Sequence, residues 1–267
     1  MYFLFPGCIL AWKSLMRRLI IREIEGRYQG SMLGRWWTVV TPIMTLAVYT
    51  FVFSIVFKSS WGASAGAGHL NVAVNLFAGL IAFNLFAESL NAAPSLITGR
   101  PSYVTKIIFP LEILSVVSVS ASVFHALVSM AILVVFQAVF AHQLSLAIVW
   151  LPLVWLPLVL GAIALSWLLA ALGVFFRDLS QITSVFTGLL MFLSAVFYPL
   201  SSLPAGIQSV MRLNPVALAV EQTRVVVVQG GYPDKTYLLY GILASFMACE
   251  FCLRFFLRSR RAFADVL

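Results

Sequence analysis

The feature that most constrains this chain is a long uncharged stretch in its middle. Between Glu112 and Arg177 the sequence contains no Asp, Glu, Lys or Arg. Such a stretch holds two membrane-crossing helices of about 20 residues each, because the hydrocarbon core of a bilayer is about 30 Å thick. Only 10% of all residues are charged, whereas soluble domains contain about 25%. The composition argues against a soluble enzyme, a soluble nucleic-acid-binding domain and a disordered chain, and predicts a polytopic membrane protein.

Hydropathy along the chain predicts an all-α fold with six transmembrane helices in a single domain, 1–267. The predicted spans lie at about 37–57, 70–90, 113–140, 146–176, 182–199 and 236–256. Residues 9–27 are too charged to span, and their apolar side chains recur every three to four residues. They therefore predict an amphipathic helix in the membrane interface. Residues 200–234 combine prolines with short apolar pieces and predict re-entrant or interface helices between spans 5 and 6.

The distribution of positive charge predicts the orientation of the chain. With a cytoplasmic N-terminus, the inside segments hold thirteen of the 17 Lys and Arg residues, and the outside segments hold four. By the positive-inside rule, both termini and the 91–110 loop are cytoplasmic, and the 200–235 segment faces outward. The three cysteines do not indicate a disulfide framework, and no cleavable signal peptide is evident. We expect a multi-pass membrane protein.

The sequence lacks the motifs of ATP hydrolysis and of ion coupling. It contains no phosphate-binding loop, and its spans carry no Asp, Lys or Arg at mid-depth. His125 is the one histidine deep in a predicted span, and a buried structural role explains it better than a proton relay. No catalytic residue, metal site or cofactor site is predicted. If the chain transports actively, another polypeptide must supply the energy.

Two pairs of opposite charges have the four-residue spacing that allows pairing along one helix. They are Glu23 with Arg27 in the amphipathic segment, and Glu250 with Arg254 near the end of the last span.

Aromatic residues gather in two of the predicted spans. Tyr49, Phe53 and Phe57 recur every four residues in the first span, and Phe192, Phe197 and Tyr198 lie in and after the fifth. Flat rings suit the apolar faces of sugars, much as they accept nucleobases. The same rings also suit lipid contact and helix packing, so both interpretations stay open.

Several short motifs, taken in order, resemble the membrane subunit of type-2 ABC exporters of polysaccharides, and most closely the O-antigen (lipopolysaccharide) export permeases. They are residues 22–34 followed by Trp36, Trp37, Thr41 and Pro42; Phe109 and Pro110; residues 173–178; residues 197–200; and Leu213, Asn214 and Pro215. Each motif is weakly specific alone, but the ordered set covers nearly the whole chain.

The resemblance implies a homodimer of six-span subunits in the bacterial inner membrane, with two ATP-binding subunits docked on the cytoplasmic side. Those partners would bind ATP and Mg²⁺ and drive a lipid-pyrophosphate-linked glycan across the membrane; no nucleic acid is involved. The candidate residues are Tyr49, Phe53, Phe57, Phe192, Phe197 and Tyr198 for the glycan channel; Arg27 and Arg35 for the lipid pyrophosphate; Arg100 and Lys106 for coupling to the ATPase; and Pro199, Pro204 and Pro215 for hinges of an outer gate.

Other functions remain open at this point. Exporters of capsular polysaccharide or teichoic acid share the architecture that the resemblance implies, and so do permeases for small molecules. A membrane-embedded polymerase or ligase of lipid-linked glycan would need a nucleophile or base in an external loop. The 200–235 segment offers only Glu221, Asp234, Arg212 and Arg224. A small channel is the remaining alternative.

Overall fold

The computed structural model describes residues 12–27, 29–56, 69–105, 109–141 and 145–266. Every regular element among these residues is helical, which confirms the predicted all-α class. Five helical segments are long and apolar enough to cross a membrane, namely Gly34–Phe53, Asn71–Ala92, Ile113–Phe140, Leu146–Phe175 and Lys235–Ala262. The predicted fifth span corresponds to α9 (Leu179–Leu193), which is apolar but has only 15 residues. The count of six spans therefore stays a prediction.

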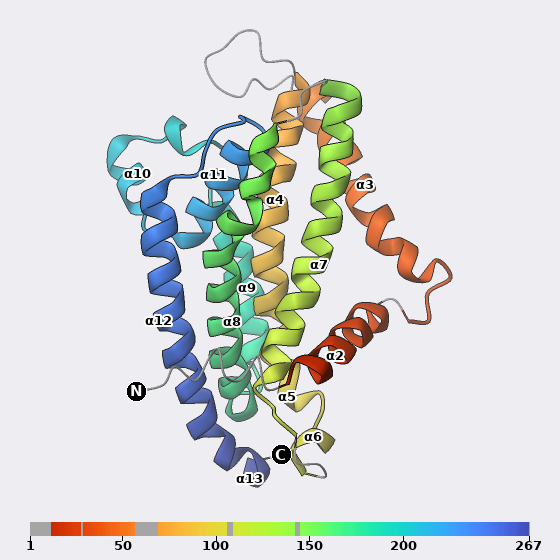
Figure 1. Ribbon diagram of the computed structural model, residues 1–267, viewed down its shortest axis with the longest axis vertical. Helices are drawn as coiled ribbons and strands as arrows, with labels where there is room; N and C mark the ends of the chain where they lie inside the picture. The colour runs from red at the N-terminus through yellow and green to blue at the C-terminus, as the bar shows by residue number, and fades with distance from the viewer. Residues whose placement is uncertain (1–11, 28, 57–68, 106–108, 142–144, 267) are drawn as a thin grey trace.

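The N-terminal part of the described chain is an amphipathic helix outside the bundle. Helix α2 (Lys13–Gly26) runs obliquely to the long helices and packs against one of them, α7 (Ile113–Phe136) (Figure 1). It buries Met16 and Leu19 but exposes Arg17 and Arg18, as a helix with one apolar face does. The first residues of the predicted segment, 9–11, lie outside the described residues.

The centre of the bundle is α4 (His69–Ala92). It packs against α3 (Trp37–Tyr49), α7, α8 (Leu151–Phe175), α9 and α11 (Pro215–Val227). Every side chain from residue 72 to residue 83 is buried, and the first exposed one is Asn84. A helix with apolar residues all round belongs in an interior, so the exposure of Asn84 marks the point where polar space opens beside α4.

The other long helices surround this centre. After α3 the chain continues in a π-helical turn, η2 (Thr50–Val56), and after α7 in a second one, η3 (Gln137–Ala141). A short 3-10 helix, η4 (Leu146–Trp150), leads into α8, against which α12 (Lys235–Ser259) packs along its length. Glu250 and Arg254 on α12 form the predicted ion pair, with 2.7 Å between Arg254 Nη2 and Glu250 Oε1.

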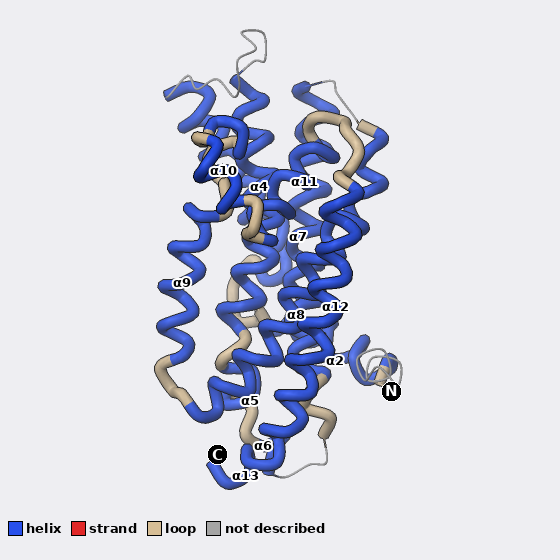
Figure 2. The backbone as a smooth tube through the Cα atoms, turned by 90° about the vertical axis from the view of Figure 1, so that its left-hand side faces the viewer, coloured by secondary structure: helices blue, strands red, loops and turns tan. Residues whose placement is uncertain are grey.

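Short helices close the two ends of the bundle. At one end, here called the basic end, lie α2, α5 (Ser95–Thr98), α6 (Ser102–Thr105), η6 (Arg260–Ala262) and α13 (Phe263–Val266) (Figures 1 and 2). At the other, here called the far end, lie η5 (Leu200–Ser202), α10 (Ala205–Met211) and α11. The described part of the 91–110 loop and the C-terminal helices therefore share one end, and the 200–234 segment occupies the opposite one.

One glycine permits the close packing of the basic end. A Cβ atom on Gly173 of α8 would lie 2.3 Å from the carbonyl oxygen of Pro94, in the turn between α4 and α5. The clash would be with a backbone carbonyl and not with a flexible side chain. Relieving it would require α8 or the turn before α5 to move as a whole. Gly173 therefore sets how closely α8 approaches the end of α4.

Candidate functional site

A polar cavity of about 1000 Å³ opens at the basic end between α2, α4 and α7. It is called the basic-end cavity below. It is lined by Arg22, Glu23, Gly26, Arg27, Gln29, Asn84, Ala87, Glu88, Asn91, Ala92, Arg100, Ser118, Ala121, Ser122 and His125. Arginine, carboxylate, carboxamide and hydroxyl side chains in one space are unusual for a chain that is 62% hydrophobic. Polar groups within membrane helices are costly, which makes this cavity the first candidate for function.

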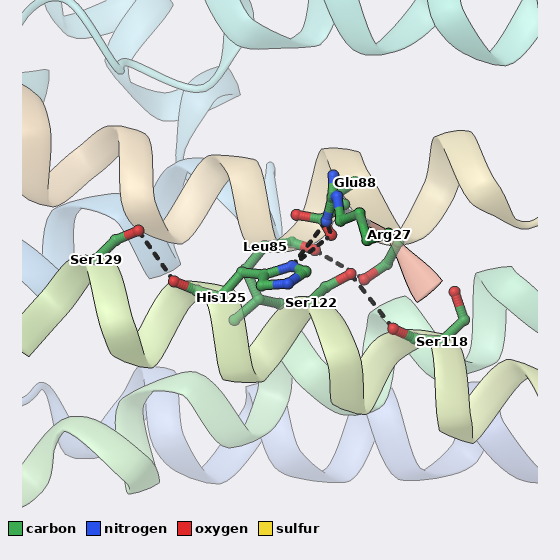
Figure 3. Close-up of polar contacts among 8 residues, drawn as sticks. Arg27, Leu85, Glu88, Ser118, Ser122, His125 and Ser129 are labelled. Atoms are coloured by element: carbon green, nitrogen blue, oxygen red, sulfur yellow. Dashed lines mark hydrogen bonds and ion pairs between the residues drawn. The ribbon is translucent and has the colours of Figure 1, made fainter. Parts of the chain in front are cut away.

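Three side chains from three helices meet at the wall of this cavity. Arg27, just after α2, forms an ion pair with Glu88 of α4 through its Nη1 atom. The same Nη1 atom lies 2.7 Å from Nδ1 of His125 on α7, and that Nδ1 lies 3.0 Å from Oε1 of Glu88. Figure 3 shows Arg27 reaching between the two long helices toward Glu88 and His125. These residues, called the Arg27–Glu88–His125 cluster below, connect α2 to the core of the bundle.

Sequence reasoning did not find this cluster as a unit. The sequence points to His125 alone, and the two partners of Arg27 lie 61 and 98 residues away from it in the chain. The one signal was that Glu88 and His125 are polar residues inside otherwise apolar helices, which predicts that they face one another or a cavity.

The predicted pairing of Glu23 with Arg27 is wrong. Glu23 instead accepts a hydrogen bond from Arg100, with 2.6 Å between Oε2 and Nη2. The four-residue spacing allows contact along α2, but α2 lies against other elements that offer both side chains closer partners. Glu23 therefore joins α2 to the loop after α5, whereas Arg27 joins it to α4 and α7.

A second contact also holds α2 to this loop. Arg22 Nη2 donates to the hydroxyl of Tyr103 in α6, at 2.6 Å. Of the two predicted coupling residues, Arg100 thus lies at the junction of α2 with the loop, and Lys106 lies outside the described residues. The loop forms α5 and α6, two single-turn helices that project from the basic end (Figure 1).

A narrower space of about 160 Å³ continues the basic-end cavity along α3. Its walls include Arg27, Glu88 and His125, together with Thr38, Thr41 and Thr45 on one face of α3. A polar strip therefore leads from the Arg27–Glu88–His125 cluster toward the first membrane span.

The aromatic candidates form two separate pairs. Tyr49 and Phe53 stack with 5.9 Å between ring centroids, beside a shallow groove of about 360 Å³ on α3 and η2. Phe192 and Phe197 lie 5.6 Å apart near the end of α9, and Tyr198 donates its hydroxyl to the carbonyl of Phe192. Helix α3 packs on α4 and α7, whereas α9 packs on α4 and α8. Phe57, the third member of the predicted stripe, lies outside the described residues.

The remaining candidates lie at element boundaries. Arg35 is exposed in the short helix η1 (Gly34–Trp36) and does not line the basic-end cavity. Pro199 and Pro204 each precede a short helix, and Pro215 is the first residue of α11. These positions suit proline because its missing N–H costs nothing at a helix start. Whether the prolines act as hinges stays a prediction.

The most buried charged side chain among the described residues is that of Arg224 on α11, whose structural role is not evident from the sequence. Its guanidinium donates to the backbone carbonyls of Asn75, Ala195, Val196 and Tyr198. Burial lowers the pKa of Arg224 to about 10, while Glu221 acts in the opposite direction, so the side chain stays charged at neutral pH. The side chain joins α4 to the turn after α9, where Ala195 adopts a positive φ of 52°.

Within the described residues, no group of three or more His, Cys, Asp or Glu side chains could hold a metal ion. The cavity wall combines arginines, two carboxylates, a histidine, carboxamides and hydroxyls. The arginines can bind anions, and the carboxamides and hydroxyls can form hydrogen bonds with sugars.

These features define a helical membrane protein with a polar cavity at one end of the bundle. A sequence profile described as ABC-2 type transporter matches residues 14–228. The chain belongs to this family of ABC transporter membrane subunits, which work with a separate ATP-binding subunit.

Three relatives show which members of the family resemble the chain. The O-antigen export system permease protein RfbA of Myxococcus xanthus is 27% identical over 230 residues, covering 85% of each chain. A protein of the same description from Klebsiella pneumoniae is 26% identical over 197 residues, covering 73% of each chain. The polysialic acid transport protein KpsM of Escherichia coli is 22% identical over 234 residues, covering 85% of this chain and 86% of its own.

Proposed function

We propose that this chain is the membrane subunit of a bacterial ABC exporter that moves a lipid-linked polysaccharide, in the first instance O-antigen, across the inner membrane. The observation that carries the proposal is the basic-end cavity, which places Arg22, Arg27 and Arg100 beside carboxamides and serines in an apolar bundle. Arginine suits bidentate contact with phosphate, and carboxamides suit sugar hydroxyls. The printed descriptions of the relatives support the same substrate class.

In this proposal the basic end faces the cytoplasm and both termini lie there. The positive-inside rule supports this orientation, because the basic end carries most of the Lys and Arg residues of the chain. A lipid pyrophosphate approaching from the inner leaflet then meets Arg27 and Arg35 first.

Two copies of the chain form the transport path, with two ATP-binding subunits that bind ATP and Mg²⁺. The sequence has no phosphate-binding loop of its own. The 91–110 loop of this chain docks on the ATP-binding subunit. Arg100, held to α2 by Glu23, passes movement of that subunit to the amphipathic helix, and Lys106 shares this coupling role.

The glycan then passes along the aromatic side chains of α3 and of the α9 exit, which make many weak and similar contacts. In a homodimer each of these rings occurs twice. The far-end helices, bounded by Pro199, Pro204 and Pro215, close the path to ions at rest.

A complementation experiment tests the proposal. The chain is expressed with its ATP-binding partner in a strain that lacks its own O-antigen permease, and surface glycan is measured by lipopolysaccharide gel. We expect export to depend on both subunits and to fall for Arg27→Ala and Arg35→Ala at normal protein levels. Normal export by both variants would leave these arginines with an anchoring role only. Glycan export without the partner, or no partner ATPase in a stoichiometric complex, contradicts the proposal.

Capsular polysaccharide is the second candidate substrate, supported by the similarity to KpsM. The same strain background distinguishes the two if it also carries a capsule locus without its permease. Restoration of capsule but not of O-antigen would assign the chain to capsule export.

A further inference from the structure

The Arg27–Glu88–His125 cluster contains a carboxylate where an anionic substrate would bind. The side chain of Glu88 is 26% exposed and that of Arg27 is 43% exposed, so both face the basic-end cavity. Arg22, Arg27 and Arg100 outnumber Glu23 and Glu88 along its walls, and Arg22 is held by the neutral hydroxyl of Tyr103. The cavity therefore has positive charge available for a ligand with two or more negative charges.

His125 gives this cluster two alternative arrangements. Its Nδ1 atom lies within hydrogen-bond distance of both Arg27 Nη1 and Glu88 Oε1. A ring nitrogen accepts when it carries no proton and donates when it carries one, so Nδ1 cannot serve both partners at once. Without a proton, Nδ1 accepts from Arg27; with a proton, Nδ1–H donates to Glu88. Nε2 is buried away from solvent, so the proton on Nδ1 comes from water in the basic-end cavity, which His125 lines, and the ring then carries a positive charge.

The second arrangement matters because it keeps Glu88 satisfied without Arg27. A carboxylate in a membrane helix that loses its only cation is strongly destabilised. Here His125 takes over as the donor to Glu88 when Arg27 turns to another anion. The cost of separating Arg27 from Glu88 is therefore reduced by a residue that is already in place.

We propose that Glu88 occupies a diphosphate subsite at rest, and that the diphosphate of the substrate displaces it from Arg27. His125 then holds Glu88, and the C-terminal end of α2 is released from α4. This inference rests on the proposed function, because it assigns the ligand chemistry of the same cavity. It adds two positioning residues, Glu88 and His125, and makes substrate binding the event that loosens α2.

The test measures access to the cavity in the complex with the ATP-binding partner in lipid nanodiscs. Cys8, Cys249 and Cys252 are replaced by Ala, and Asn84→Cys places a reporter thiol in the cavity wall. The rate of labelling by a water-soluble maleimide is measured with and without farnesyl diphosphate, and with farnesol as the uncharged control. We expect farnesyl diphosphate, but not farnesol, to raise the labelling rate severalfold.

Three variants test which side chains cause the rise in the labelling rate. Glu88→Gln should label severalfold faster at rest and gain nothing from farnesyl diphosphate. His125→Ala should label slowly at rest and respond less than the parent chain, because Glu88 then has no second donor. Glu250→Gln, a matched loss of a carboxylate that pairs within α12, should behave as the parent. If Glu88→Gln does not assemble, Arg27→Gln removes the same contact from the side of α2 with the same expected gain.

Equal resting labelling of the parent and Glu88→Gln overturns the inference, and so does an undiminished response to farnesyl diphosphate in either Glu88→Gln or His125→Ala. These outcomes leave export by the parent chain untouched. A parent chain that exports no glycan overturns the proposed function instead, whatever the labelling shows.

Discussion

Different interactions stabilise the two ends of the bundle. At the basic end, ion pairs between side chains connect separate elements, as in Arg100 with Glu23 of α2 and Arg260 with Glu112 before α7. At the far end, one buried guanidinium binds backbone carbonyls of α4 and of the turn after α9. Ion pairs can exchange partners with a ligand or a docking protein, whereas carbonyls fixed in the backbone cannot follow a departing side chain.

The two ends also differ in how exposed their charged side chains are to solvent. The side chains of Arg100 and Glu23 are 30% and 29% exposed, whereas that of Arg224 is 1% exposed. Solvent-exposed ion pairs contribute about 0–1 kcal/mol to stability, but removing one partner from a buried charged site costs about 3–5 kcal/mol. The comparison indicates that the basic end is built to rearrange and that the far-end helices are fixed to α4.

The largest expected effect tests the far end. Arg224→Ala removes the donor shared by four carbonyls and leaves Glu221 without its cation, so we expect a loss of about 3–5 kcal/mol in stability. The midpoint of heat denaturation of the detergent-solubilised complex is measured, with gel filtration as the readout. Arg212→Ala, which changes an exposed arginine after α10, is the control and should melt as the parent. Equal melting of both variants would mean that Arg224 does not fix this end.

The next effect tests whether the basic end also has a rigid part. Gly173→Ala places a methyl group against the carbonyl of Pro94, and overpacking of this kind costs about 1–3 kcal/mol. Gly161→Ala on the same helix meets nothing within 4 Å and should be neutral or slightly stabilising. The same melting measurement compares the two. A harmless Gly173→Ala would show that α8 and the α4–α5 turn move apart easily.

A smaller effect on stability, but a clear one on activity, is expected from the coupling pair. Arg100→Glu breaks the contact with Glu23 and should change stability by less than about 1 kcal/mol, because both side chains are partly exposed. We expect weaker assembly with the ATP-binding subunit or a loss of substrate-stimulated ATP hydrolysis, and a similar loss for Lys106→Glu. The double change Glu23→Arg with Arg100→Glu restores opposite charges and should recover part of the activity. Full activity of Arg100→Glu and Lys106→Glu alone contradicts the coupling role.

The smallest expected effect concerns the aromatic pair at the end of the first span, Tyr49 of α3 and Phe53 of η2. Tyr49→Ala or Phe53→Ala removes a ring pair worth about 0.5–1.5 kcal/mol, so assembly should persist. If the rings contact the glycan, export should shift toward shorter chains on a lipopolysaccharide gel. Phe51→Ala, an exposed ring on the same segment, is the matched control. Equal chain lengths in all three variants would leave Tyr49 and Phe53 as packing or lipid-facing side chains.

Much of the architecture was predictable because hydropathy is a local property of the chain. Uncharged stretches, the amphipathic rhythm before Gly26 and the prolines after Tyr198 indicated long spans, a surface helix and short far-end helices. The family could also be recognised, since its motifs are short and occur in order. The length of α9 was not predicted as well, because apolar residues continue past Leu193 into a turn that Arg224 stabilises.

What the sequence by itself determined is therefore the class of the protein and the positions of most of its long helices. Only the tertiary structure decided which charges meet. Glu23 pairs with Arg100, and Arg27 pairs with Glu88 and His125, because α2 packs on α7 and lies beside the basic-end cavity, which α4 and Arg100 also line. The physical reason is that an ion pair depends on which side chains the packing brings within a few ångströms, and separation along the chain does not specify that.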